Sequence, residues 1–195
     1  MNRLIFGITL VLAVAVLAVP AHADHDPLTL EPVDANWTSN DTSNLSVSEI
    51  EAITGMTDLT SLYKNDVGTG EGGEPFAGSY TTVYSNTPAD PSEALITYDG
   101  GPAIDTSQPT VLVVKDGNQE PAQYLFDLTN VVANPNAWNG TDPLHLVDFW
   151  PTEGAISHIE ILGGTGTSVP EPISLLLFGT GLVGIGLVSR KRARL

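Results

Sequence analysis

Residues Thr110–Lys115 read TVLVVK, with four consecutive apolar side chains between a threonine and a lysine. A strand with one face in water alternates apolar and polar residues, whereas a strand covered on both faces is apolar throughout. The segment is rich in β-branched residues, which favour strands, and it is short for a helix. It therefore predicts a central strand with other parts of the molecule packed on each face.

Further strands are predicted before and after this segment, because apolar and aromatic residues alternate and turn-forming Gly, Pro, Asn and Asp separate the runs. In the QYLFDL segment, the alternation places Tyr124, Phe126 and Leu128 on the inward face. The succession of short strands without intervening helical repeats predicts an all-β domain, an antiparallel β-sandwich or jelly roll. The other predicted strands are 59–64 (the first of the sheet), 79–85, 94–98, 123–128, 144–150 and 156–162.

One short N-terminal helix is predicted. Ser46 and Glu49 have the Ser-x-x-Glu spacing of a capping box, in which each residue satisfies a backbone N–H of the other. Ile50 and Ile53 share one face, and Gly55 stands where a left-handed residue ends a helix. The helix has only about two turns by this reading, so it is expected to decorate the sandwich.

The charge of the chain is strongly negative and unevenly distributed. The 195 residues carry a formal charge of -16, but residues 24–168 contain 22 acidic residues and only two basic ones, Lys64 and Lys115, a net charge of -20. Nucleic acid is excluded as a partner, because phosphate neutralisation needs clustered Lys or Arg. The chain has no cysteine, so its stability must come from the core or from bound metal.

The N-terminal segment has the pattern of a secretory signal peptide. Arg3 precedes an apolar run over 4–19, and Ala21 and Ala23 form a small-x-small cleavage site ahead of Asp24. We therefore predict a signal peptide over 1–23, removed by signal peptidase. The alternative, an uncleaved membrane anchor, is less favoured because the apolar run is short for a membrane span.

The C-terminal segment has the same parts in reverse order. A Gly/Ser/Thr linker is predicted over 163–168, followed by a 169–195 segment in which 173–189 carries no charge. Those 17 residues would cover about 25 Å as a helix, near the lower limit for a transmembrane span. The basic tail 190–195 would stay in the cytoplasm and leave the main domain, 24–162, on the other side of the membrane.

The order Pro170-Glu171-Pro172, an apolar Gly- and Leu-rich segment and a basic terminus resembles the PEP-CTERM sorting signal of Gram-negative bacteria. The resemblance implies that a membrane-embedded exosortase recognises the tail, that the precursor resides transiently in the inner membrane, and that the protein is then released or transferred outward. An ordinary single-pass anchor that is never cleaved is the alternative. The resemblance makes Pro170, Glu171 and Pro172 recognition residues, and Arg190, Lys191, Arg192 and Arg194 retention charges.

No catalytic residue is assigned from the sequence. Ser, His and Asp are present, but without a Gly-x-Ser-x-Gly elbow, and both His145 and His158 are expected at the solvent edge of strands. A glycosidase needs two carboxylates at a fixed separation across a cleft, which sequence spacing does not show. We therefore expect a protein that is not an enzyme, with a secreted polysaccharide-acting enzyme (glycoside hydrolase or lyase) as the alternative.

Two ligand classes remain open. Calcium takes six to eight oxygen ligands, which acidic turns can supply. The Asp and Asn residues in the turns of this chain lack the spacing of an EF-hand, and such residues also suit ordinary turns. Trp138 lies between turns and is expected to expose its ring for stacking on a sugar, whereas Trp150 is expected in the core. The predicted role is structural, adhesive or glycan-binding, at the cell surface or in extracellular polysaccharide and biofilm; a calcium-dependent adhesin is a further alternative. The calcium candidates are Asp24, Asp26, Asp99, Asp116 and Asn118.

Overall fold

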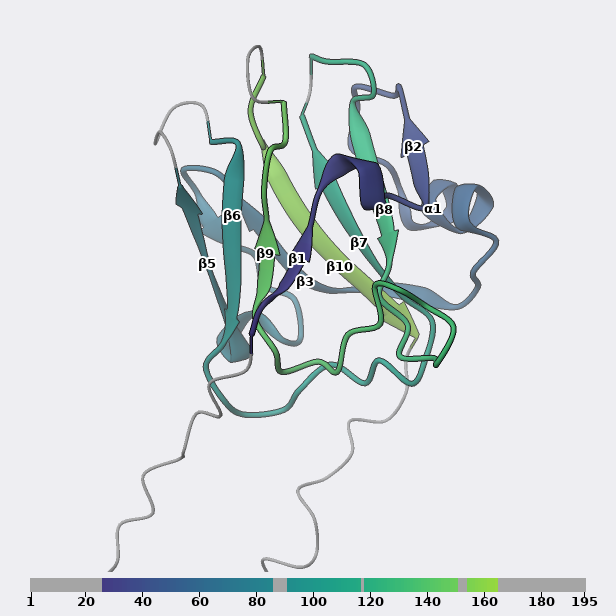
Figure 1. The fold of residues 1–195 in the computed structure, drawn as a ribbon, viewed down its shortest axis with the longest axis vertical. Coiled ribbons are helices and arrows are strands. Elements are labelled where there is room, and N and C mark those ends of the chain that lie inside the picture. The colour runs from purple at the N-terminus through teal and green to yellow at the C-terminus, as the bar shows by residue number, and fades with distance from the viewer. Residues whose placement is uncertain (1–25, 86–90, 117, 151–153, 165–195) are drawn as a thin grey trace, which may run out of the picture.

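The computed structural model describes residues 26–85, 91–116, 118–150 and 154–164, which form a β-sandwich of two packed sheets (Figure 1). The four-stranded sheet has the order β1-β9-β6-β5 and the six-stranded sheet the order β2-β8-β7-β10-β3-β4. The strands are β1 (Leu28–Leu30), β2 (Trp37–Ser39), β3 (Leu59–Asp66), β4 (Gly70–Glu71), β5 (Tyr80–Ser85), β6 (Glu93–Tyr98), β7 (Thr110–Lys115), β8 (Gln123–Asp127), β9 (Leu144–Leu146) and β10 (His158–Gly164). The helices are α1 (Val47–Thr54) and two 3-10 turns, η1 (Pro32–Asp34) and η2 (Ala77–Ser79).

The predicted all-β sandwich with one short helix is confirmed. All the strand pairs are antiparallel except β1 with β9, which run parallel in the register Leu28 to Leu144. β1 lies at the edge of the four-stranded sheet, where β9 is its one neighbour.

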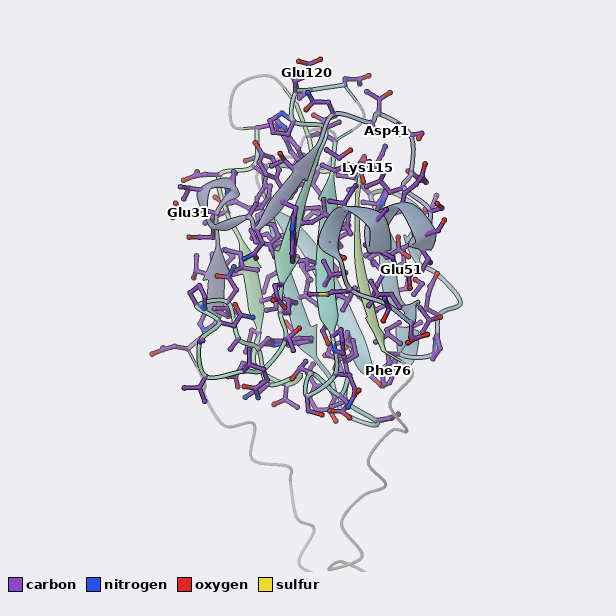
Figure 2. The ribbon with its side chains drawn as sticks, turned by 90° about the vertical axis from the view of Figure 1, so that its right-hand side faces the viewer. Glu31, Asp41, Glu51, Phe76, Lys115 and Glu120 are labelled. Atoms are coloured by element: carbon purple, nitrogen blue, oxygen red, sulfur yellow. The ribbon has the colours of Figure 1, made fainter. Side chains whose placement is uncertain are left out.

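The TVLVVK segment forms β7, and all six of its residues are buried, as predicted for a strand covered on both faces. Leu112 and Val114 point into the core between the two sheets. Val111 and Val113 point outward and pack with Ile50 of α1 in a second apolar cluster. Figure 2 shows α1 lying across the outer face of the six-stranded sheet.

The predicted helix and both of its ends are also confirmed. The Glu49 backbone N–H donates to the Ser46 hydroxyl, and the Ser46 N–H donates to the Glu49 carboxylate at 2.7 Å. Gly55 ends the helix in the left-handed region, with φ of 73°.

Several strand boundaries differ from the prediction. Two short strands, β1 and β2, precede β3, so the 59–64 segment is not the first strand. β9 ends at Leu146 because Asp148 and Trp150 have φ of 59° and 46°, which an extended strand does not allow. β10 continues to Gly164, so the first two residues of the predicted 163–168 linker belong to a strand.

The predicted signal peptide and C-terminal sorting segment lie outside the described residues. This applies to Ala21, Ala23, the three residues of the Pro170-Glu171-Pro172 motif and the basic tail. Within the described part of the chain, no helix is both long and apolar enough to cross a membrane.

Candidate functional site

An open cavity of about 280 Å³ lies where two loops meet at one end of the sandwich. One loop joins β6 to β7 and the other joins β8 to β9 (Figure 1). We call this cavity the loop pocket. It is lined by Ala103, Ile104, Asp105, Thr106, Ser107, Asn130 and Asn139.

Hydrogen bonds from the core tie the two loops together beneath the pocket. The buried hydroxyl of Tyr80 donates to the Gly140 carbonyl at 2.7 Å and accepts the Ile104 N–H at 2.9 Å. The Thr106 hydroxyl donates to the Trp138 carbonyl at 2.7 Å. Both loops are therefore fixed by side chains that belong to the fold, and the pocket is preformed.

Trp138 does not expose its ring, contrary to the sequence prediction. It is only 2% exposed, packs in the core against Tyr80, and donates its indole N–H to the Asp142 carbonyl at 2.7 Å. The ring is part of the core cluster, so it offers no face for sugar stacking. Its neighbour Asn139 lines the loop pocket instead. Trp150 lies in the core, as predicted.

The pocket offers several polar groups that are not used within the described part of the chain. Asp105 accepts the Ser107 hydroxyl and N–H through Oδ1, which leaves Oδ2 open. Asn139 accepts the N–H groups of Thr141 and Asp142 through its oxygen, so its NH₂ group is open. The Asn130 side-chain amide has no hydrogen bond there either, whereas its backbone N–H donates to the Thr106 carbonyl at 2.7 Å. Donors and acceptors beside the apolar residues Ala103 and Ile104, two of them held by hydrogen bonds within their loops, suit a small hydroxylated ligand.

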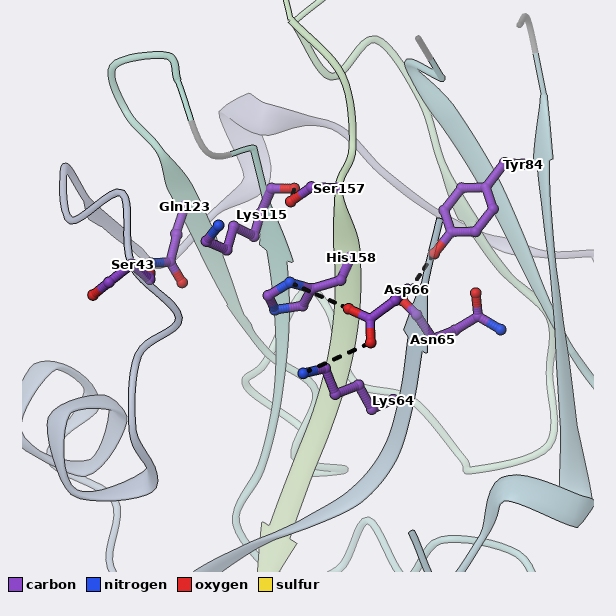
Figure 3. A network of polar contacts seen from close by, with 9 residues as sticks. All are labelled: Ser43, Lys64, Asn65, Asp66, Tyr84, Lys115, Gln123, Ser157 and His158. Carbon is purple, nitrogen blue, oxygen red and sulfur yellow. Dashed lines mark hydrogen bonds and ion pairs between the residues drawn. The ribbon is translucent and has the colours of Figure 1, made fainter. Parts of the chain in front are cut away.

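A second polar cluster lies on the outer face of the six-stranded sheet (Figure 3). Strand register places Gln123, Lys115, His158 and Asp66 side by side across β8, β7, β10 and β3. We call this set the polar row. Lys64 pairs with Asp66 at 3.9 Å, so both basic residues of the -20 segment lie in or beside the row.

His158 is buried and not at a solvent edge, contrary to the sequence prediction, because β10 is an interior strand of its sheet. Burial, reinforced by the positive charges of Lys64 and Lys115, lowers the pKa of His158 to about 4; Asp66 opposes this shift. His158 is therefore neutral at pH 7. Its Nδ1 lies 3.8 Å from Asp66, and this contact becomes an ion pair only if the ring is protonated.

The polar row is not arranged as a Ser-His-Asp triad. The nearby Ser157 hydroxyl donates to the Lys115 carbonyl at 2.9 Å and not to the histidine. Gln123 is fully buried, and its NH₂ group donates to the carbonyls of Asp41 and Ser43, both at 2.8 Å. These contacts attach the segment between β2 and α1 to the sheet, which is a structural role.

The residues predicted for calcium are not brought together where the structure describes them. Asp26 is exposed ahead of β1, and Asp99 accepts the Thr81 hydroxyl at the end of β6. Asp116 is buried, and its two oxygens accept the N–H groups of Asn118 and Ala155 at 2.9 and 3.0 Å, as in a turn. Asp24 lies outside the described residues, among which no group of three or more His, Asp or Glu could hold a metal.

The loop pocket was not predicted. Asp105, Asn130 and Asn139 occur in Ser-, Thr-, Gly- and Asn-rich segments that indicate turns, and they are up to 34 positions apart in the sequence. The only signal in the sequence was the length of the two loops, since long loops in compact domains are often functional.

Comparison with known proteins agrees with the resemblance described above. The family model of the PEP-CTERM protein-sorting motif matches residues 168–192. No curated protein and no solved structure matches the chain. The motif indicates a protein that is sorted by exosortase, and such sorting implies export to the cell surface or the extracellular space.

Proposed function

We propose that this protein is held in the inner membrane as a precursor, sorted by exosortase, and then acts in the extracellular polysaccharide by binding glycan in the loop pocket. The observation that carries the proposal is the preformed cavity with open groups on Asp105, Asn130 and Asn139. Carboxylate and amide groups accept and donate hydrogen bonds to sugar hydroxyls. The role would be adhesive or structural.

The charge of the domain selects among glycans. A segment with a net charge of -20 repels anionic polymers, so uncharged, hydroxyl-rich chains are the favoured ligands. Asp105 is the one carboxylate among the residues that line the pocket, whereas glycoside hydrolysis needs a pair about 5 to 9.5 Å apart. The pocket thus supports binding better than the enzymatic alternative.

The test is a glycan array probed with the secreted protein purified from its native host. We expect binding to uncharged glycans, and we expect Asp105→Ala to weaken it at least tenfold because a sugar hydroxyl loses its acceptor. Asp99→Ala is the matched control, since Asp99 is an exposed loop carboxylate that does not line the pocket. Equal binding by the two variants would exclude the pocket as the glycan site.

Calcium dependence is checked in the same preparation. If the alternative of a calcium-dependent adhesin holds, calcium raises the melting temperature and a chelator lowers it. Identical melting curves in calcium and in chelator would eliminate that alternative and leave glycan binding in the loop pocket unaffected.

A further inference from the structure

Two consecutive valines project from the loop that joins β8 to β9. Val131 is 48% exposed and Val132 is fully exposed. We call them the valine tip. A lone exposed apolar residue needs no explanation, but an adjacent pair on a loop is a small apolar surface that water solvates poorly.

Hydrogen bonds within the loop fix the conformation of the segment that carries the valine tip. The Asn134 side chain donates to the carbonyls of Asp127 and Thr129, both at 2.8 Å, and the Asn134 N–H donates to the Val131 carbonyl at 2.9 Å. These bonds close the loop at its base. The valines therefore lie in a turn whose two ends are joined by hydrogen bonds.

The tip lies near the point where the described chain ends. Leu128 donates its N–H to the Thr110 carbonyl, and Gly164 donates its N–H to the Pro109 carbonyl, both at 2.9 Å. β8 and β10 flank β7, so these two points are about 10 Å apart, two strand spacings. The loop with the tip and the exit of the chain toward the sorting motif thus share one end of the sandwich (Figure 1).

The loop that carries the tip is itself uncharged, which suits a lipid surface, although Asp105 of the facing loop lines the same pocket as Asn130. Residues 128–141 carry no charge, although residues 24–168 contain 22 acidic residues. An acidic domain is repelled by anionic lipid headgroups, and this repulsion is weakest where the domain presents an uncharged loop. Valine side chains gain free energy by leaving water for the interfacial region of a bilayer.

The expected membrane segment keeps this end of the domain close to the bilayer. Only residues 165–172 separate Gly164 from the predicted span at 173–189, and eight residues reach at most about 30 Å. A short tether raises the effective concentration of the loop at the surface to the millimolar range. Two valines bury less apolar surface than one acyl chain, which itself binds membranes only marginally, so they would not hold a free domain there.

We propose that the valine tip rests on the membrane surface while the precursor is anchored, and that this contact is lost when sorting cuts the tether. The inference rests on the membrane-held precursor of the proposed function. It assigns the tip a lipid partner, and it explains why an acidic exported domain keeps two adjacent exposed valines.

The absence of cysteine allows single-site labelling. Residues 24–195, the precursor expected after removal of the signal peptide, carry Val132→Cys labelled with an environment-sensitive fluorophore and are reconstituted in phosphatidylcholine vesicles that contain a spin-labelled quencher lipid. Val33→Cys is the matched control, because Val33 is 83% exposed and lies in η1, beyond the far end of β1. We expect a blue shift and several-fold stronger quenching at position 132 than at position 33.

The outcomes separate this inference from the proposed function. If the chain does not float with the vesicles, the membrane-held precursor and the membrane contact are both overturned, whereas glycan binding in the loop pocket is decided separately by the glycan array. If it floats and the two positions are quenched equally, only the membrane contact is overturned. In a labelled Val131→Cys chain, adding Val132→Asp should reduce quenching several-fold while the melting temperature is unchanged, since position 132 is fully exposed; unchanged quenching would also overturn the contact.

Discussion

The hydroxyl of Tyr80 donates a hydrogen bond of 2.7 Å to the carbonyl oxygen of Gly140, 60 positions later in the chain. The Tyr80 hydroxyl oxygen also accepts the Ile104 N–H, so one core side chain joins the two loops that form the loop pocket. Burial raises the pKa of Tyr80 well above its ordinary value, so the phenol stays protonated and can donate at any physiological pH. The geometry of the pocket therefore depends on a residue that does not line it.

Removing this hydroxyl should weaken both stability and ligand binding. Tyr80→Phe leaves the Ile104 N–H and the Gly140 carbonyl without their buried partner, which costs about 1 to 3 kcal/mol of unfolding free energy. Urea unfolding measures this loss, and the glycan array measures the loss of affinity. Tyr84→Phe is the control, because its hydroxyl makes one 3.0 Å bond to the Asn65 carbonyl, away from the pocket; equal effects on affinity would contradict the assigned role of Tyr80.

Gly140 should tolerate no side chain. Its φ is +84°, and a Cβ placed there would lie 2.4 Å from the Ile104 carbonyl oxygen. Gly68 has a similar φ of +87° with nothing within 4 Å, so Gly68→Ala reports the cost of the backbone conformation alone, about 1 kcal/mol. Gly140→Ala should cost a further 1 to 3 kcal/mol or so from the clash and should displace the loop, and chemical denaturation of both variants measures the difference. Equal losses would show that the two loops can separate without cost.

The sandwich could be predicted because its strongest patterns are local. The uninterrupted apolar run of β7 implied cover on both faces, and Ser46, Glu49 and Gly55 marked the helix that covers one of them. Trp138 was wrongly expected at the surface because its neighbours are turn residues, whereas burial depends on Tyr80 and Asp142, which reach the ring only in the folded protein. The loop pocket depends on such long-range contacts throughout, so no local pattern indicated it.

The buried neutral His158 makes stability depend on pH. Its pKa is 6.5 in the unfolded chain and about 4 in the folded protein, so the unfolded state binds the proton more tightly. Above about pH 6.5 His158 is neutral in both states and does not lower the free energy of unfolding. As the pH falls from 6.5 toward 4, the free energy of unfolding decreases by up to about 3 kcal/mol, at roughly 1.4 kcal/mol per pKa unit. The charges of Lys64 and Lys115 oppose protonation of His158, and the charge of Asp66 favours it. Burial raises the pKa of nearby Glu160, so protonation of Glu160 increases the free energy of unfolding as the pH falls and offsets part of the loss from His158.

His158→Gln isolates this contribution, because glutamine is polar but does not titrate. Urea unfolding gives the free energy of unfolding at about pH 7 and at about pH 4. Between these two pH values, the wild-type protein should lose up to about 3 kcal/mol more of this free energy than the variant does. His145→Gln is the control from the other sheet, since β9 lies in the four-stranded sheet. If His158→Gln leaves the pH dependence unchanged, the acid sensitivity comes from other groups.

The sorting motif predicts that the exported protein differs in length from its precursor. In the native host, mass spectrometry of the secreted protein should find no peptide from 173–195, because exosortase acts on the segment that begins with Pro170, Glu171 and Pro172. In a strain without exosortase, the same peptides should persist and the protein should remain with the membrane fraction, held by its apolar segment and basic tail. Replacing Arg190, Lys191, Arg192 and Arg194 with Ser should impair retention of the precursor, since these residues carry four of the seven positive charges of the chain. An intact C-terminus on the secreted protein of the native host would instead indicate an anchor that is never processed.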